Sequence, residues 1–125
     1  ATILGVLAQR LVRRLCPQCK QETSMNEQEW EHLTFDYIME MPETMYKAVG
    51  CETCRHTGYK GRVGIYEFMP VSLELKSLIS AHGTLNDLKV QAKKEGVEPL
   101  RIAGARKVIE GVTTLEEVLR VVPLS

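Results

Sequence analysis

Two short stretches, CPQCK at residues 16–20 and GCETCRHTGYKGR at residues 50–62, contain all four cysteines of this 125-residue chain. Two residues separate the members of each cysteine pair, and 31 residues separate one pair from the other. Segments of the form Cys-x-x-Cys fold into tight turns that direct both sulfurs inward, and two such turns complete a four-thiolate shell around tetrahedral zinc. The sequence therefore predicts a structural zinc site with the ligands Cys16, Cys19, Cys51 and Cys54.

Other uses of the cysteines fit less well. Usual zinc ribbons have about 15–20 residues between the pairs, so the longer insert disfavours a simple ribbon without changing the ligand chemistry. A c-type haem requires histidine directly after the second cysteine, where this chain has Arg55, and a thioredoxin-like redox motif requires a βαβ context. An iron–sulfur cluster stays open as an alternative. His56 could replace a ligand, but with four cysteines available we expect it either beside the ligands, without contacting the metal, or at the surface.

Composition and charge narrow the class of protein. The chain has 16 basic and 16 acidic side chains and 44% hydrophobic residues, which is typical of one soluble domain or two very small ones. A neutral total does not favour nucleic-acid binding, and we interpret the basic residues at 10, 13, 14 and 20 as a solvated helix face. No apolar run approaches the roughly 18 residues of a membrane span. The opening ATILGVLA is a poor signal peptide, so we expect a cytosolic chain without disulfides.

Local patterns predict a mostly α fold with a small β element. Apolar residues recur at helical spacing over residues 3–15, and Ser24 and Glu27 are spaced as a capping box for a short helix. A short strand is expected near Tyr46 to Val49, and a hairpin or two short strands are expected between Gly58 and Pro70. Four short helices follow in residues 72–122. Their start signals are Ser72, Thr84, Pro99 and either Thr113 or Thr114, and their stop signals include Gly83, Gly96, Gly111 and Pro123.

These elements divide into three predicted parts. Residues 1–15 form an opening helix, residues 16–70 form a tetracysteine zinc module with a short β hairpin, and residues 71–125 form a small four-helix C-terminal domain. The chain contains no G-x-x-x-x-G-K-[ST] phosphate-binding motif, so we expect that it does not hydrolyse ATP by itself. From its residues alone, this is a zinc-stabilised helical module that binds or couples. The alternative is a free-standing zinc adaptor that binds protein or nucleic acid.

Three segments in order carry a resemblance to a known family: GVLAQRLVRRLCPQCK at 5–20, GCETCRHTGYKGRVGIYEFMPVS at 50–72 and GVTTLEEVLRVV at 111–122. Together they strongly resemble the C-terminal region of the type II secretion and type IV pilus-assembly ATPases. The resemblance covers nearly the whole chain except the insert from about Gln21 to Ala48. It does not distinguish secretion from pilus assembly.

The resemblance implies a fragment of a RecA-like, P-loop ATPase that powers type II secretion or type IV pilus assembly. Members are cytoplasmic hexamers that act at the inner-membrane face, so the implied partners are the other subunits and an inner-membrane platform protein. ATP and magnesium would bind upstream of this chain. Residues 1–15 would be the closing helix of the ATPase domain, and the four cysteines would be the family's zinc site. Arg62 matches an arginine that lies close to the nucleotide in relatives, which makes it a candidate nucleotide contact.

Overall fold

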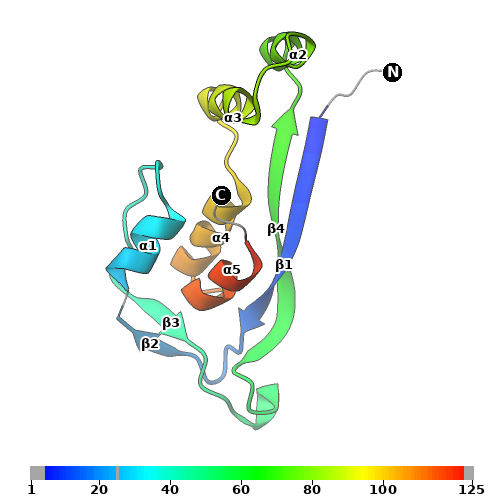
Figure 1. Ribbon diagram of the computed structural model, residues 1–125. Coiled ribbons are helices and arrows are strands. Elements are labelled where there is room, and N and C mark those ends of the chain that lie inside the picture. The colour runs from blue at the N-terminus through cyan, green and yellow to red at the C-terminus, as the bar shows by residue number, and fades with distance from the viewer. Residues whose placement is uncertain (1–4, 25, 123–125) are drawn as a thin grey trace.

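The computed structural model describes residues 5–24 and 26–122. In this part of the chain, β1 (Gly5–Leu15) and β4 (Tyr59–Pro70) form a long antiparallel ribbon, and β2 (Gln21–Thr23) and β3 (Met45–Lys47) form a second, short one (Figure 1). The described helices are α1 (Glu27–Leu33), α2 (Leu73–Ser80), α3 (Leu85–Lys94), α4 (Leu100–Ile109) and α5 (Leu115–Val121). None of them is long and apolar enough to cross a bilayer.

The first element is a strand, so the helix expected over residues 3–15 is wrong. β1 pairs with β4 from Gly5 opposite Pro70 to Leu15 opposite Tyr59. Apolar residues lie on both faces of β1, with Val12 buried and Leu11 half exposed, and this distribution also fits helical spacing. The pairing partner lies about fifty residues away along the chain, so the local pattern does not contain the information that selects the strand. Positions 3 and 4 of the expected helix are outside the described residues.

The hairpin expected between Gly58 and Pro70 is also wrong, because β4 is one continuous strand that passes through Gly61 and Gly64. The register shifts between Arg13 and Leu15, opposite the segment that contains Gly61. The glycines therefore accompany an irregularity within one strand and do not mark a turn between two. The short strand expected near Tyr46 to Val49 is present as β3, which begins one residue earlier and ends two residues earlier.

Local start signals predict most helices correctly. Ser72, Thr84 and Thr114 are the N-caps of α2, α3 and α5, and each side chain accepts a backbone N–H from the third residue after it. Pro99 is the N-cap of α4. In α1, the cap is Asn26, whose Oδ1 accepts the N–H of Glu29 at 3.1 Å, so the capping box expected at Ser24 is wrong.

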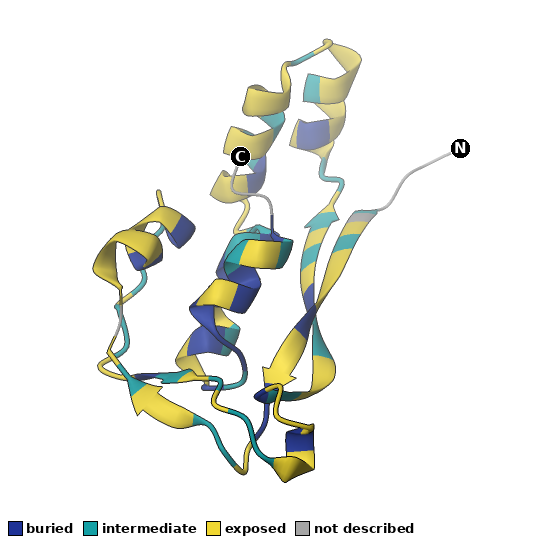
Figure 2. Cartoon of the chain, turned by 60° about the horizontal axis from the view of Figure 1, so that its bottom comes forward, coloured by how far each residue is buried: buried dark blue, intermediate teal, exposed yellow. Residues whose placement is uncertain are grey.

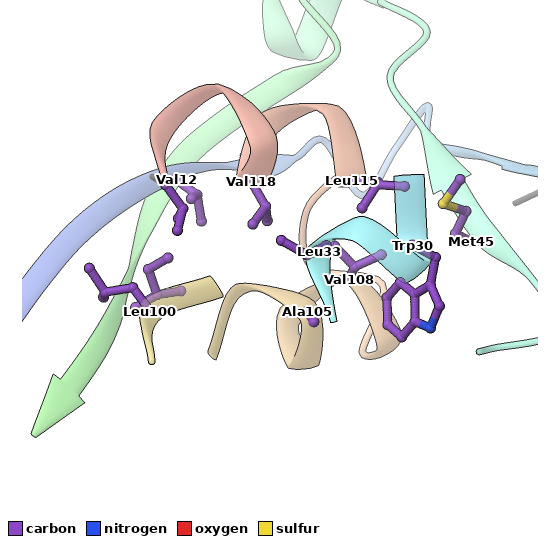
Figure 3. Packing of buried hydrophobic residues seen from close by; sticks show 11 residues of the cluster. Val12, Trp30, Leu33, Met45, Leu100, Ala105, Val108, Leu115 and Val118 are labelled. Carbon is purple, nitrogen blue, oxygen red and sulfur yellow. The ribbon is translucent and has the colours of Figure 1, made fainter. Parts of the chain in front are cut away.

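The main hydrophobic cluster joins residues from all three predicted parts of the chain (Figure 3). Its buried members are Val12, Trp30, Leu33, Met45, Ile65, Leu100, Ala105, Val108, Leu115, Val118 and Val122. Figure 2 shows buried residues concentrated in α4 and α5. At the crossing of these helices, a Cβ on Gly104 would lie 2.5 Å from a methyl group of Val118, so only glycine permits this approach. The division into three domains stays a prediction.

A buried carboxylate attaches α5 to the ribbon. Glu117 is 1% exposed, and one of its oxygens accepts the backbone N–H of Arg13 at 2.8 Å. The guanidinium groups of Arg13 and Arg120 lie 3.0 and 2.9 Å from its oxygens. Burial alone would raise the pKa of Glu117, but the bonds from Arg120 and Arg13 outweigh it and lower that pKa to about 2. The ionised carboxylate therefore stabilises the folded chain.

Replacing this carboxylate is expected to destabilise the fold in a pH-dependent way. The pKa of Glu117 is about 2 in the folded chain, against the usual 4.5. Its contribution to the free energy of unfolding is therefore complete above about pH 5 and is lost as the pH falls towards 2. Glu117→Gln should lower the free energy of unfolding by roughly 2 kcal/mol at pH 7, less than the pKa difference implies because both arginines are exposed. Urea unfolding at several pH values measures this loss.

Glu116→Gln is the matched control, because Glu116 lies in the same first helical turn and is exposed. It should change stability by less than about 0.5 kcal/mol. The difference in free energy of unfolding between wild type and Glu117→Gln should narrow as the pH falls from about 5 to 2. A difference that stays constant over this range would contradict the stabilising role of the ionised Glu117 carboxylate.

Candidate metal centre

The second cysteine pair forms a tight turn at the start of the ribbon. Cys51 precedes a short 3-10 helix, Glu52–Cys54, and the N–H of His56 donates to the carbonyl of Cys51 at 2.7 Å. Arg55 and His56 both adopt left-handed backbone conformations, with φ of 58° and 62°. The 3-10 turn brings the sulfurs of Cys51 and Cys54 within 3.8 Å of each other, and the two left-handed residues then reverse the chain towards β4.

The first cysteine pair is fixed to the same place by strand pairing. Cys16 directly follows β1, and its N–H donates to the carbonyl of Gly58 at 3.0 Å. The N–H of Lys20 returns to the carbonyl of Cys16 at 3.1 Å and closes the turn. Because β1 and β4 are antiparallel, the end of β1 and the start of β4 meet, and the two turns face each other.

The four predicted ligands lie together. Their sulfurs are all within 4.8 Å of one another, and the pairs Cys16–Cys51, Cys19–Cys54 and Cys51–Cys54 are each 3.8 Å apart. A tetrahedron with Zn–S distances of about 2.3 Å has edges of about 3.8 Å, so the spacing fits zinc. A disulfide requires about 2.05 Å, and the four cysteines are free thiols. The grouping of the four cysteines expected from the sequence is confirmed.

Backbone donors favour the thiolate form of some of these cysteines. Burial opposes ionisation of Cys54, but N–H groups of Cys51 and Gly58, both 3.2 Å from its sulfur, help lower its pKa to about 6. The N–H of Cys54 likewise lowers the pKa of Cys51. At Cys19, the Gly50 N–H favours the thiolate, but burial and the neighbouring sulfurs raise its pKa to about 11. All four cysteines could be thiolates together only beside a cation that neutralises them, because without one the neighbouring sulfurs keep Cys19 protonated.

Gly58 links the two turns at close range. It donates to Cys54, its carbonyl accepts from Cys16, and its φ is +83°. A Cβ at this position would lie 2.5 Å from the Cβ of Ala48. Only glycine satisfies both the conformation and the space.

Arg62, the predicted nucleotide contact, lies on β4 outside the cysteine cluster. His56 lies in the turn before β4, is exposed and is not a member of the cluster. Arg62 is opposite Arg13 in the ribbon. Both line a pocket of about 430 Å³ with Arg120, Thr57, Tyr59, Gly61 and Leu11. The guanidinium of Arg13 also lies 4.1 Å from the centre of the Tyr59 ring.

The sequence patterns do not predict this arginine pocket. They place Arg13 on a solvated helix face, whereas it pairs with a carboxylate 104 residues away. The basic residues between positions 10 and 20 are the sequence feature that could have indicated this pocket. However, only the pairing of β1 with β4 places Arg13 opposite Arg62.

Comparison with known proteins agrees with the motif order. Residues 1–120 match the family described as "Type II/IV secretion system protein". The chain belongs to this family.

Individual relatives support the same assignment. The chain is 65% identical over all of its 125 residues to the type IV pilus assembly ATPase TfpB of Acinetobacter baylyi, and these residues are 21% of that protein. It is 45% identical to the type II secretion system protein E of Pseudomonas aeruginosa, over 97% of this chain and 24% of the relative. The type IV pilus assembly ATPase PilB of Thermus thermophilus is 40% identical over 95% of this chain and 13% of its own length. The chain therefore spans between about an eighth and a quarter of these relatives.

Two glycine substitutions should separate backbone strain from the close approach at the cysteine turns. Gly58→Ala and Gly61→Ala share a left-handed φ, of +83° and +78°, but a Cβ at Gly61 would meet nothing within 4 Å. We expect Gly61→Ala to cost about 1–2 kcal/mol of strain and Gly58→Ala to cost roughly 1–3 kcal/mol more. Unfolding of the zinc-loaded chain in urea gives both values.

Chelator competition on the same variants adds a second measurement. Of these two glycines, only Gly58 donates its N–H to a cysteine sulfur, so added zinc should be lost more readily from Gly58→Ala than from Gly61→Ala. Equal losses of stability and zinc in the two variants would show that the close approach to Ala48 contributes nothing.

Proposed function

We propose that this chain is the zinc-binding C-terminal part of a hexameric ATPase that powers type II secretion or type IV pilus assembly. The observation that carries the proposal is the cluster of four cysteine sulfurs within 4.8 Å, in a chain that belongs to the type II/IV secretion family over residues 1–120. In this proposal the chain has a structural role and transmits domain motion, and it does not catalyse ATP hydrolysis. ATP and magnesium bind elsewhere in the longer protein.

Zinc would be held by Cys16, Cys19, Cys51 and Cys54. A complete four-thiolate shell leaves no open coordination position, so the metal supplies folding energy and activates no water. Apparent zinc binding in small modules contributes about 10–16 kcal/mol. Energy of that size would fix the turns at the base of the ribbon, and with them the 31-residue insert that they enclose.

The coupling role rests on how the ribbon connects the elements. β1 and β4 join the cysteine turns at one end to α2 at the other, and Glu117 attaches α5 to β1. An element braced at several points moves as a unit, which suits the transmission of a domain motion. The proposed partners are neighbouring subunits of the hexamer and an inner-membrane platform protein. The proposed location is the cytoplasmic face of that membrane.

Arg62 is proposed as a contact to the nucleotide or to the domain that binds it. Its support is the pocket that it lines together with Arg13 and Arg120. Those two arginines share the carboxylate of Glu117, so the three guanidinium groups and this carboxylate carry a net positive charge. The excess positive charge suits a phosphate group.

Chimeric proteins test the proposed function. We would replace the matching region of A. baylyi TfpB, which is 65% identical, with this chain and purify the product. The chimera should contain one zinc per subunit, form hexamers and hydrolyse ATP, while the isolated chain should show no magnesium-dependent turnover above a mock purification. Cys51→Ser should remove the zinc and at least most of the activity.

Replacing the matching region of the P. aeruginosa type II secretion system protein E with this chain would show in which of the two proteins the chain better supports hexamer formation and ATP hydrolysis. A folded, zinc-containing chimera without hexamers or activity in either background would overturn the coupling role. Activity that survives the loss of zinc in Cys51→Ser would overturn the structural role of the metal.

Arg62→Ala in the active chimera tests the nucleotide contact separately. Loss of one charge-assisted hydrogen bond should raise KM for ATP about tenfold or more without changing zinc content or stability. Arg10→Ala is the control, because Arg10 is also exposed on the ribbon but lies opposite Ile65, outside the pocket. Equal kinetics for the two variants would remove Arg62 from the nucleotide site.

A further inference from the structure

Helices α2 and α3 form a unit apart from the main core, here called the arm (residues 72–95). In Figure 1 the arm lies at the end of the ribbon away from α5, and α2 and α3 pack on each other. Leu75 and Ala92 are buried in the arm, but the main hydrophobic cluster, within the described residues, includes no residue of α2 or α3. The arm is therefore not held in place by that cluster.

A short elbow, residues 95–99, joins the arm to α4. It contains Gly96, whose φ is +84° and where an added Cβ would meet nothing within 4 Å, and it ends at Pro99, the N-cap of α4. The segment has no helical or strand structure beyond the cap of α3. The arm is also joined to β4 through residues 71–72, so changes of backbone angle at both junctions would swing the arm away from the core and leave α2 and α3 supported only by each other.

The turn after α1 reaches across to this elbow from the insert. The carboxylate of Asp36 lies 2.8 Å from Nζ of Lys93, near the end of α3, and the same ammonium group donates to the carbonyl of Asp36. Asp36 holds a left-handed backbone conformation with φ of 67°. Aspartate tolerates this conformation better than most residues. Here the conformation directs one carboxylate oxygen and the backbone carbonyl oxygen of Asp36 at the ammonium group of Lys93.

The next residue, Tyr37, contacts both sides of the elbow. Its ring centre lies 4.7 Å from Nζ of Lys93 on α3 and 5.2 Å from the guanidinium carbon of Arg101 on α4. Its hydroxyl is 3.5 Å from the carbonyl oxygen of Val97 in the elbow itself. Arg101 also donates to the carbonyl of Leu33 at 2.9 Å, which fixes it to the end of α1.

We propose that Asp36, Tyr37, Lys93 and Arg101 form a clamp that sets the angle of the arm relative to the core. This assigns a function to the insert between the cysteine pairs: it positions the arm. The clamp is releasable, because the side chains of Lys93 and Asp36 are 41% and 66% exposed, and an exposed ion pair is weak. Release leaves the main cluster and the cysteine turns intact. The clamp also lines a pocket of about 520 Å³ between arm and core, which release would widen.

Hydrogen exchange of the zinc-loaded chain, read by mass spectrometry, tests the clamp. Asp36→Asn removes the charge and keeps a residue suited to the left-handed conformation. It should accelerate exchange in residues 73–94 about two- to fivefold, the effect of one exposed ion pair, and leave α4 and α5 unchanged. Tyr37→Leu should accelerate the same amides, whereas Tyr37→Phe, which keeps the ring, should stay close to wild type.

Glu110→Gln is the matched control, since it breaks an exposed ion pair with Lys107 that lies within the α4 region, away from the elbow. It should not change exchange in the arm. The clamp is overturned if Asp36→Asn and Tyr37→Leu leave arm exchange at the wild-type rate, or if they accelerate exchange uniformly through the chain. Neither outcome bears on ATP hydrolysis, so the proposal stands or falls separately from the motor function.

Discussion

The pairing of β1 with β4 is the constraint on which the other features depend. The two strands are separated by the whole insert, and their antiparallel register brings Cys16, at the end of β1, next to Gly58 and the turn that holds Cys51 and Cys54. The same register places Arg13 opposite Arg62 and puts Val12 and Ile65 in the core. A one-residue slip would reverse the two faces of β1 and separate the cysteine turns.

Long-range pairing of this kind has an entropic cost that a metal site offsets. Closing a long insert into a fixed geometry loses chain entropy, and the cost rises only slowly with length. A metal bound by the four cysteines of the two turns would compensate for that cost in a single binding event. The strand pairing brings the sulfurs together, and metal binding would in turn hold the strands in register. Each feature therefore stabilises the other.

Sequence patterns predict what depends on neighbouring residues. The caps Ser72, Thr84 and Thr114 act within one helical turn, so the sequence places α2, α3 and α5 correctly. The cysteine spacing, a property of two local turns, predicts the cluster. By contrast, β1 resembles a helix in the sequence because its apolar residues fit helical spacing and the β4 partner is remote. The contact between Arg13 and Glu117 spans 104 residues, and no local pattern indicates it.

The two ends of the ribbon are held by forces of very different strength. At the cysteine end, buried and half-buried cysteines and backbone donors surround the position of the proposed zinc, whose binding would contribute on the order of 10 kcal/mol. At the arm end, the contacts across the elbow include an exposed ion pair and two ring–cation contacts, worth about 1 kcal/mol each or less. A load applied along β1 and β4 would therefore be relieved first by rotation at the elbow, while the cysteine turns kept their geometry. In the proposed coupling element this ordering would decide which part moves: the arm would turn on a base that the bound metal would hold fixed.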